Sequence, residues 1–394
     1  MSFIYSWRWF GPKDPVSLDD IRQTGAAAVV TALHQIPAGD AWPLDEIEKR
    51  TAMIAGHGLE WIMVESIPVH EDIKKRTGNY RTYIDNWKTT LRRLARSGIR
   101  RICYNFMPVL DWSRTDLRIV MPDGTIGTGF ESVLFGVFDL FMLNRPGADH
   151  DWPDTVVQKA RNMYSSMNAD TQRTLINTVL LGFPGSLETR PLDQLKRDIA
   201  AYDGMNAATL RENLLAFLGE VIPEAQDAGV LLAIHPDDPP WPLLGLPRIV
   251  GTAEDLAAIT AAIDVAENGI TLCTGSLGAG YFNDVAALAK RFASRINFAH
   301  LRNVRRTPSG DFTETHHLDG DLDLHGVVRE LVYEQRRRTA EGRSDNRIPM
   351  RPDHGLLMNL EQGKKDIYPG YSLLGRMRGL AEIRGLASGI EGMP

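Results

Sequence analysis

Short apolar runs alternate along the chain with longer segments in which apolar residues recur every three or four positions. The short runs are rich in β-branched and aromatic residues, which favour strands, whereas the longer segments have the spacing of amphipathic helices. The predicted strands cover residues 7–10, 26–33, 59–66, 100–106, 231–236, 270–275, 296–304 and 348–355. A helical pattern accompanies each of them, so the chain repeats one strand–helix unit.

Repeated strand–helix units predict a parallel sheet covered by helices, because parallel strands need long crossover connections. Eight units are the number that closes a (β/α)8 barrel of the TIM type, and we expect one such α/β domain over residues 1–394. An open doubly wound sheet is the alternative. No GxGxxG sequence follows the first strand, which disfavours the dinucleotide-binding form of that fold.

The alternation is interrupted after the fourth strand, at residues 107–205, which we interpret as a large, mostly helical insertion. It contains an Asp-Gly turn signal within 118–127, typical of a hairpin. The polar stretch DWSRTD at 111–116 directly follows strand four. Loops on the catalytic face of a barrel set specificity, so we expect part of the insertion to cover the active site, with Trp112 and Arg114 touching the substrate. An oligomer contact or plain surface packing is the alternative.

Four side chains that bind metals lie at the ends of four consecutive predicted strands. They are His235 on the fifth strand, Cys273 on the sixth, His300 on the seventh and Asp353 on the eighth. Any one of them alone is more often structural, but parallel barrel strands all end at one rim, so the four are expected to meet there. This placement predicts a metal site.

The ligand types narrow the choice of metal. Two imidazoles, one thiolate and one carboxylate suit Zn²⁺, Fe²⁺ or Co²⁺ better than Mg²⁺ or Ca²⁺. If all four side chains bind, substrate oxygens need further coordination positions, which favours Fe²⁺ or Mn²⁺ over a closed tetrahedral site.

Charge and composition exclude several classes of protein. The net charge of −6 argues against a nucleic-acid partner, which usually requires a basic face. No apolar run reaches the roughly 18 residues of a membrane span. Only two cysteines, Cys103 and Cys273, occur in 394 residues, and the start of the chain lacks the pattern of a secretory signal. We therefore expect a cytoplasmic protein.

Long collinear stretches resemble one family. They are TALHQIP (31–37), VESIPVHEDIK (64–74), GNYRTYIDNW (78–87), YNFMPVLDWSRTDL (104–117), HPDDPPWPLLGLPRIV (235–250), LCTGS (272–276), AHLRN (299–303), MRPDHG (350–355) and PGYSLLGRMRGLAE (369–382). In these stretches the chain is similar to the D-mannonate dehydratases of the bacterial hexuronate pathway. The resemblance implies a xylose-isomerase-like barrel that dehydrates D-mannonate to 2-keto-3-deoxy-D-gluconate with Fe²⁺ or Mn²⁺.

The resemblance also implies roles for individual residues. The family's metal ligands fall on the four side chains already singled out, and its acid–base residues fall on His354 and Tyr371. Histidine has a suitable intrinsic pKa near 6.5, and tyrosine, near 10, can serve as an acid or as a base. Which of the two removes the C2 proton stays open at this point.

An anionic sugar acid needs cationic and amide groups in its pocket. Arg302 and Arg351 each lie two residues from a predicted ligand and so share its barrel face, where they are expected to bind the substrate or to form internal ion pairs. Asn105 ends strand four and is predicted to bind a sugar hydroxyl. His34 and Glu65 end strands two and three, where substrate contact and support of other residues are equally expected.

Two other functions are compatible with the same barrel. One is a metal-dependent sugar isomerase, although such sites are richer in carboxylates than this one. The other is a sugar-acid binding protein without catalysis, which the full ligand set and His354 disfavour. A homodimer is expected from the barrel type rather than from particular residues.

Overall fold

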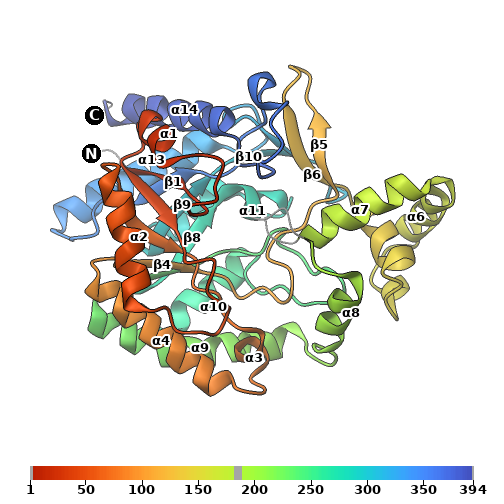
Figure 1. Cartoon of the computed structure of the whole chain (residues 1–394), viewed down its shortest axis with the longest axis horizontal. Helices are drawn as coiled ribbons and strands as arrows, with labels where there is room; N and C mark the ends of the chain where they lie inside the picture. Colours follow the sequence, from red (N-terminus) through yellow and green to blue (C-terminus); the bar gives the residue numbers. More distant parts are fainter. Residues whose placement is uncertain (1–2, 182–188, 393–394) are drawn as a thin grey trace.

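The computed structural model describes residues 3–181 and 189–392, and its centre is a closed barrel of eight parallel strands (Figure 1). Around the barrel the strand order is β1-β2-β3-β4-β7-β8-β9-β12. The strands are β1 (Ile4–Arg8), β2 (Ala28–Thr31), β3 (Glu60–Glu65), β4 (Arg101–Tyr104), β7 (Leu231–Ile234), β8 (Asn268–Cys273), β9 (Ile296–Leu301) and β12 (Pro349–Pro352). Each overlaps one of the eight predicted runs, and the predicted TIM-type barrel is confirmed.

Helices cover the outside of the barrel and follow the strands in chain order. They are α1 (Leu18–Gln23), α2 (Leu44–Gly56), α3 (Glu71–Lys75), α4 (Tyr80–Arg96), α9 (Ala207–Ala228), α10 (Ala253–Ala262), α11 (Thr274–Ala279), α12 (Val285–Arg291), α13 (Leu324–Ala340) and α14 (Leu373–Glu391), with short turns η3 (Ala293–Arg295) and η4 (Asn359–Glu361). Local sequence sets their ends: Ser17 and Thr252 form capping boxes at α1 and α10. None of the described helices is long and apolar enough to cross a membrane.

The predicted interruption lies between β4 and β7, which are neighbours in the barrel. It begins with the antiparallel strands β5 (Asp116–Val120) and β6 (Ile126–Phe130), joined through the predicted Asp123-Gly124 turn. Helical elements follow: α5 (Ser132–Val137), η1 (Phe138–Met142), η2 (Ala148–His150), α6 (Asp154–Ser166), α7 (Ala169–Leu181) and α8 (Leu192–Ala200). Helices α6 and α7 project to one side of the barrel (Figure 1). Residues 182–188 of the proposed insertion, 107–205, lie outside the described residues.

The predicted strand at 296–304 is wrong in one respect, because it divides into two strands. Barrel strand β9 ends at Leu301, and β10 (Asn303–Arg306) starts a second hairpin with β11 (Phe312–Thr315). The backbone N–H of Arg302, at the break, donates to the hydroxyl of Thr274 instead of continuing the ladder. Strand β11 pairs with β6, so both hairpins form one four-stranded antiparallel sheet at the carboxyl end of the barrel.

A small apolar cluster fills the interior of the barrel. It consists of Val30, Met63, Cys103, Ala233 and Phe298, all buried. Phe298 is two residues before His300 on β9, so both side chains point inward, and their ring centroids are 4.3 Å apart. The barrel is therefore closed by a hydrophobic floor, and polar chemistry is confined to the carboxyl ends of the strands above it.

Candidate active site

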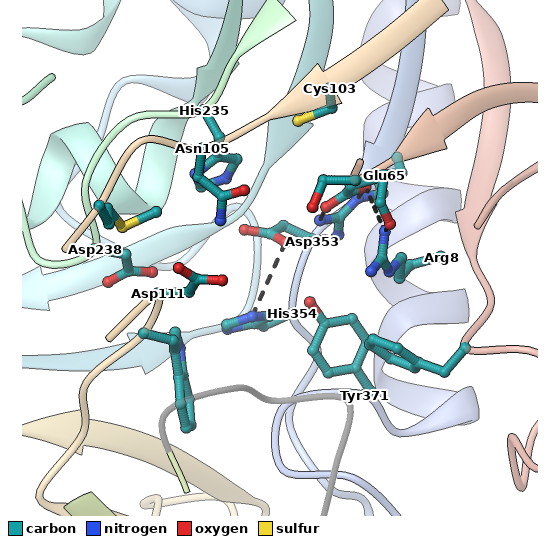
Figure 2. A pocket seen from close by; sticks show the side chains of 15 residues that line it. Arg8, Glu65, Cys103, Asn105, Asp111, His235, Asp238, Asp353, His354 and Tyr371 are labelled. Atoms are coloured by element: carbon teal, nitrogen blue, oxygen red, sulfur yellow. Dashed lines mark hydrogen bonds and ion pairs between the residues drawn. The ribbon is translucent and has the colours of Figure 1, made fainter. Parts of the chain in front are cut away.

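A cavity opens at the carboxyl ends of the barrel strands and is lined mainly by charged and aromatic side chains (Figure 2). Residues from the ends of several strands and from the loops behind them reach its wall. Those with chemical groups are Arg8, Glu65, Ser66, Cys103, Asn105, Asp111, Trp112, His235, Asp238, Arg351, Asp353, His354 and Tyr371. This is the end of the barrel at which the sequence predicted the chemistry.

Three of the four predicted metal ligands meet at this end. The ligand atoms of His235, Cys273 and His300 all lie within 4.8 Å of one another. Cys273 and His300 are register partners on β8 and β9, and His235 directly follows β7. Asp353, directly after β12, places Oδ2 3.3 Å from the Sγ atom of Cys273. The four predicted residues are thus brought together, with His235 and Asp353 at the cavity wall and the other two buried behind it.

The donor set fits a divalent cation. Nδ1 of His235 lies 2.7 Å from the carbonyl oxygen of Pro236, which fixes this nitrogen as the donor and leaves Nε2 as the ligand atom. Nε2 of His235 lies 3.2 Å from Nδ1 of His300, so two imidazole nitrogens face each other within the cluster that includes Cys273. A lone pair on a nitrogen there needs a partner, and a metal ion would satisfy it.

Two arginines hold the carboxylate of Asp353. Arg351 donates from Nη1 to Oδ1 at 2.6 Å, and Arg302 donates from Nε to Oδ2 at 2.7 Å. Burial alone would raise the pKa of Asp353, but the positive charges of Arg351 and Arg302 outweigh burial and hold it well below the usual range. Asp353 is therefore an anion at any physiological pH.

Glu65, predicted from the end of β3, supports the same cluster from the other side. It accepts bonds from Arg351 at 3.0 and 2.8 Å, and Nη1 of Arg8 lies 3.5 Å from its Oε2. Nε2 of His300 is also 3.5 Å from Oε2 of Glu65. Arg351 and Arg8 lower the pKa of Glu65 well below its usual range, although burial acts to raise it.

His354 and Tyr371 form the adjoining wall of the cavity, with ring centroids 5.0 Å apart (Figure 2). A turn from Tyr368 to Tyr371 places the tyrosine: Pro369 and Gly370 occupy its central positions, Gly370 has φ of 78°, and the Tyr371 N–H donates to Tyr368 at 2.9 Å. Burial is the main cause that raises the pKa of Tyr371 above its usual value of 10, so its hydroxyl keeps its proton at neutral pH.

Glu314 is the neighbour of His354 that sequence reasoning missed. Its carboxylate oxygens lie 2.7 and 2.8 Å from Nδ1 of His354, and both residues are buried. Glu314 belongs to β11, whose hairpin was not predicted, so no strand-end signal pointed to it. Arg8 ends β1 at the cavity and was overlooked because the predicted first strand, 7–10, ended two residues later and so placed Arg8 inside the strand.

The predicted substrate-binding residues divide into two groups. Asn105, Trp112, Arg351 and Glu65 line the cavity. The other three do not line the cavity. His34 is exposed and contacts Phe10, with ring centroids 5.9 Å apart. Arg302 and Arg114 are buried.

Arg114 and Arg302 are both held in ion pairs with buried carboxylates. Arg114 binds Asp238 at 2.9 Å and Glu314 at 2.7 Å. Arg302 binds the same two residues at 2.6 and 2.9 Å, in addition to Asp353. Two buried cations thus hold three buried anions, and neither arginine lines the cavity.

Comparisons with known proteins agree on one family. The model of the D-mannonate dehydratase family matches residues 3–394. The chain is 48% identical over 390 residues to the mannonate dehydratase of a Marinomonas species, covering 98% of this chain and 99% of that protein. It is 48% identical over 388 residues to the mannonate dehydratase of Rhizobium meliloti, covering 97% and 96%. The crystal structure of mannonate dehydratase from Streptococcus suis serotype 2 superposes with a TM-score of 0.77 at 33% identity, covering 99% and 93% of the two chains.

Proposed function

The chain belongs to the D-mannonate dehydratase family, and from this premise we propose that it is a hydro-lyase that converts D-mannonate to 2-keto-3-deoxy-D-gluconate and water in hexuronate catabolism. In this reaction C2 loses a proton and C3 loses hydroxide, which together make one water. The enol that remains between C2 and C3 then tautomerises to the ketone. The observation that carries the proposal is the meeting of a metal-competent cluster with His354 and Tyr371 in one cavity.

A divalent metal, Fe²⁺ or Mn²⁺, would be held by His235, Cys273, His300 and Asp353. When bound there, it would supply positive charge to the carboxylate and C2 hydroxyl of the substrate and so make the C2 proton more acidic. Arg302 and Arg351 keep Asp353 ionised and oriented for this role. Glu65 lies beside His300 and holds Arg351 in place.

The chain's own groups move the two protons. His354 and Tyr371 share a wall of the cavity, so one takes the C2 proton and the other protonates the departing C3 hydroxyl. Asn105 and Trp112 contact the sugar chain from the segment after β4, and Arg351 acts at the cavity wall by holding Glu65 and Asp353. His34, Arg114 and Arg302 act on the substrate only through residues that they contact.

The test is a product assay on metal-stripped protein supplied with D-mannonate. Fe²⁺, Mn²⁺, Zn²⁺ or Mg²⁺ is added back singly, and the 2-keto-3-deoxy product is measured for the wild type, Cys273→Ser and, as a control cysteine from the barrel floor, Cys103→Ser. We expect Fe²⁺ or Mn²⁺ to restore turnover, with a large loss only in Cys273→Ser. Folded wild-type protein that forms no product with any metal would refute dehydration. Keto–aldose interconversion without loss of water would instead favour the isomerase.

We also propose that the protein is a cytoplasmic homodimer that acts on a small sugar acid. Two adjacent aromatic side chains, Tyr281 and Phe282, are 58% and 60% exposed, and a second copy would cover such a surface. Light scattering on the purified protein tests the dimer directly, and a monomeric mass would refute it.

A further inference from the structure

Glu314 reaches the active site from outside the barrel. Strand β11 carries it in the four-stranded sheet, where the neighbouring residues Phe312 and Thr313 pair with Phe130 and Gly129 of β6. Its side chain is 4% exposed and points back to the carboxyl end of β12, where it meets the imidazole of His354. The same hairpin therefore links the segment after β4 to a residue that lines the cavity.

We propose that Glu314 is a positioning residue for the reaction: its carboxylate holds the proton of His354 on Nδ1 and turns Nε2, with its lone pair, toward the substrate. The inference rests on the proposed function, since it gives His354 the part of the proton acceptor. Tyr371, on the same wall of the cavity, is then the group that protonates the leaving C3 hydroxyl. This division of roles is what sequence reasoning left open.

The geometry of the pair supports this tautomer. An ionised carboxylate has only acceptor atoms, so a nitrogen 2.7 and 2.8 Å from the two oxygens of Glu314 must carry hydrogen. In a neutral imidazole the other nitrogen then has the lone pair. Nε2 of His354 is 3.9 Å from Oδ1 of Asp353, at the side of the predicted metal ligands (Figure 2). A base must have its free lone pair within reach of the C–H group, and this tautomer provides it.

Two arginines prevent Glu314 from turning away or taking up a proton. Nη2 of Arg114 and Nη1 of Arg302 both donate to Oε1, at 2.7 and 2.9 Å. A charged site that is buried and held by several donors is preorganised, because its dipoles are already in place before the substrate arrives. The ion pairs of Arg114 and Arg302 therefore have a function for His354 as well as for folding.

The same contacts determine what Glu314→Gln does. Both arginines require an acceptor, so the amide oxygen takes the position of Oε1 and the NH₂ group takes that of Oε2, at 2.7 and 2.8 Å from Nδ1. The NH₂ group opposes a hydrogen on Nδ1, and the amide lacks the negative charge that holds this hydrogen. The tautomer with the proton on Nε2, where it blocks the lone pair, therefore gains population. Glu314→Asp keeps the charge but shortens the side chain by one methylene, so a partial effect is expected.

Glu334 provides a matched control. It is also buried and is also held by two arginines, Arg337 and Arg338, but it lies on α13 and binds no histidine. We expect Glu314→Gln to lower kcat about 10²- to 10³-fold with KM near the wild-type value, and Glu314→Asp to recover part of kcat. Glu334→Gln should leave kcat unchanged. Equal kcat in folded Glu314→Gln and wild type would overturn the proposal.

The tautomer itself gives a second measurement that needs no activity and no variant of Glu314. Long-range ¹H–¹⁵N spectra of protein labelled in its histidine rings and loaded with diamagnetic Zn²⁺ show which nitrogen bears the proton, and His354→Gln identifies the signals. We expect wild-type His354 protonated on Nδ1 and a larger share of the Nε2-protonated tautomer in Glu314→Gln. A wild-type proton on Nε2 overturns the proposal even if Glu314→Gln does not fold. Wild type that shows the expected tautomer but does not dehydrate mannonate refutes the proposed function alone.

Discussion

The guanidinium of Arg302 donates from Nε to Oδ2 of Asp353 at 2.7 Å, with both side chains buried at the carboxyl end of the barrel. The same guanidinium also binds Asp238 and Glu314, so one cation connects a predicted metal ligand to the partner of His354. Buried charges are costly unless they are paired, and here the pairing also fixes the functional side chains.

Arg302→Met should strongly destabilise the protein, because three buried carboxylates would then share the remaining cations. Breaking a buried ion pair from one side costs about 3–5 kcal/mol, and we expect a loss of this size in the free energy of unfolding from urea titrations. Arg337→Met is the control: Arg337 is 45% exposed in its pairs with Glu334 and Glu341, and should cost less than about 1 kcal/mol. Similar losses in both variants would contradict the argument.

Metal binding should raise the melting temperature of the protein, and this increase should depend on Cys273 but not on Cys103. A ligand that binds only the folded state, at 100 times its Kd, adds about 2.7 kcal/mol to the free energy of unfolding. We expect Mn²⁺ to stabilise the wild type and Cys103→Ala, and to stabilise Cys273→Ala much less. Cys103 is a suitable control because it is also buried. It lies in the barrel floor beside Thr271 and is not one of the predicted ligands. A metal-dependent shift that persists in Cys273→Ala would place the metal elsewhere.

The meeting of the four predicted ligands at one rim could be predicted because it depends only on where the barrel strands end. A buried strand followed by a break is visible in the sequence, and all parallel strands of a barrel end at the same rim. His235, Cys273 and His300 needed no knowledge of side-chain contacts, and neither did Asp353. Tyr371 and His354 came from the resemblance to a family, because their roles depend on a turn and on a neighbour that no local pattern reveals.

Glu314 and the ion-pair partners of Arg302 and Arg114 could not be predicted in the same way. They depend on the pairing of β11 with β6, two strands that are about 180 positions apart in the sequence. They also depend on which charged groups are buried next to one another. Alternation correctly placed Arg302 and Arg351 near the ligands, but it does not distinguish an arginine open to a substrate from one bound by carboxylates. That distinction requires the three-dimensional contacts.

The stability that Glu334 contributes should disappear in acid. Burial acts to raise the pKa of Glu334, but hydrogen bonds and charges from Arg337 and Arg338 outweigh it, and its pKa is lowered on folding. A carboxyl whose pKa falls on folding stabilises the protein above its unfolded pKa, near 4.3, and loses that contribution as the pH falls through the lower folded value. Glu334→Gln should therefore cost about 1–3 kcal/mol at pH 7 and progressively less below pH 4, measured by denaturant titration at each pH. A pH-independent difference would contradict this account.

Gly370→Ala should impair catalysis by more than its effect on stability explains. Gly370 has φ of 78°, and an added Cβ would lie 3.0 Å from Cγ of His354, so both the turn that carries Tyr371 and the imidazole would shift. Gly204→Ala is a close control, because Gly204 has φ of 79° and open space around the position of a Cβ. The left-handed backbone costs an alanine about 1–2 kcal/mol at either position. We expect both variants to lose a similar free energy of unfolding from backbone strain, with any additional loss in Gly370→Ala. We expect kcat to fall only in Gly370→Ala. A wild-type kcat in both folded variants would contradict this prediction. It would mean that the reaction does not depend on how this turn positions His354 and Tyr371.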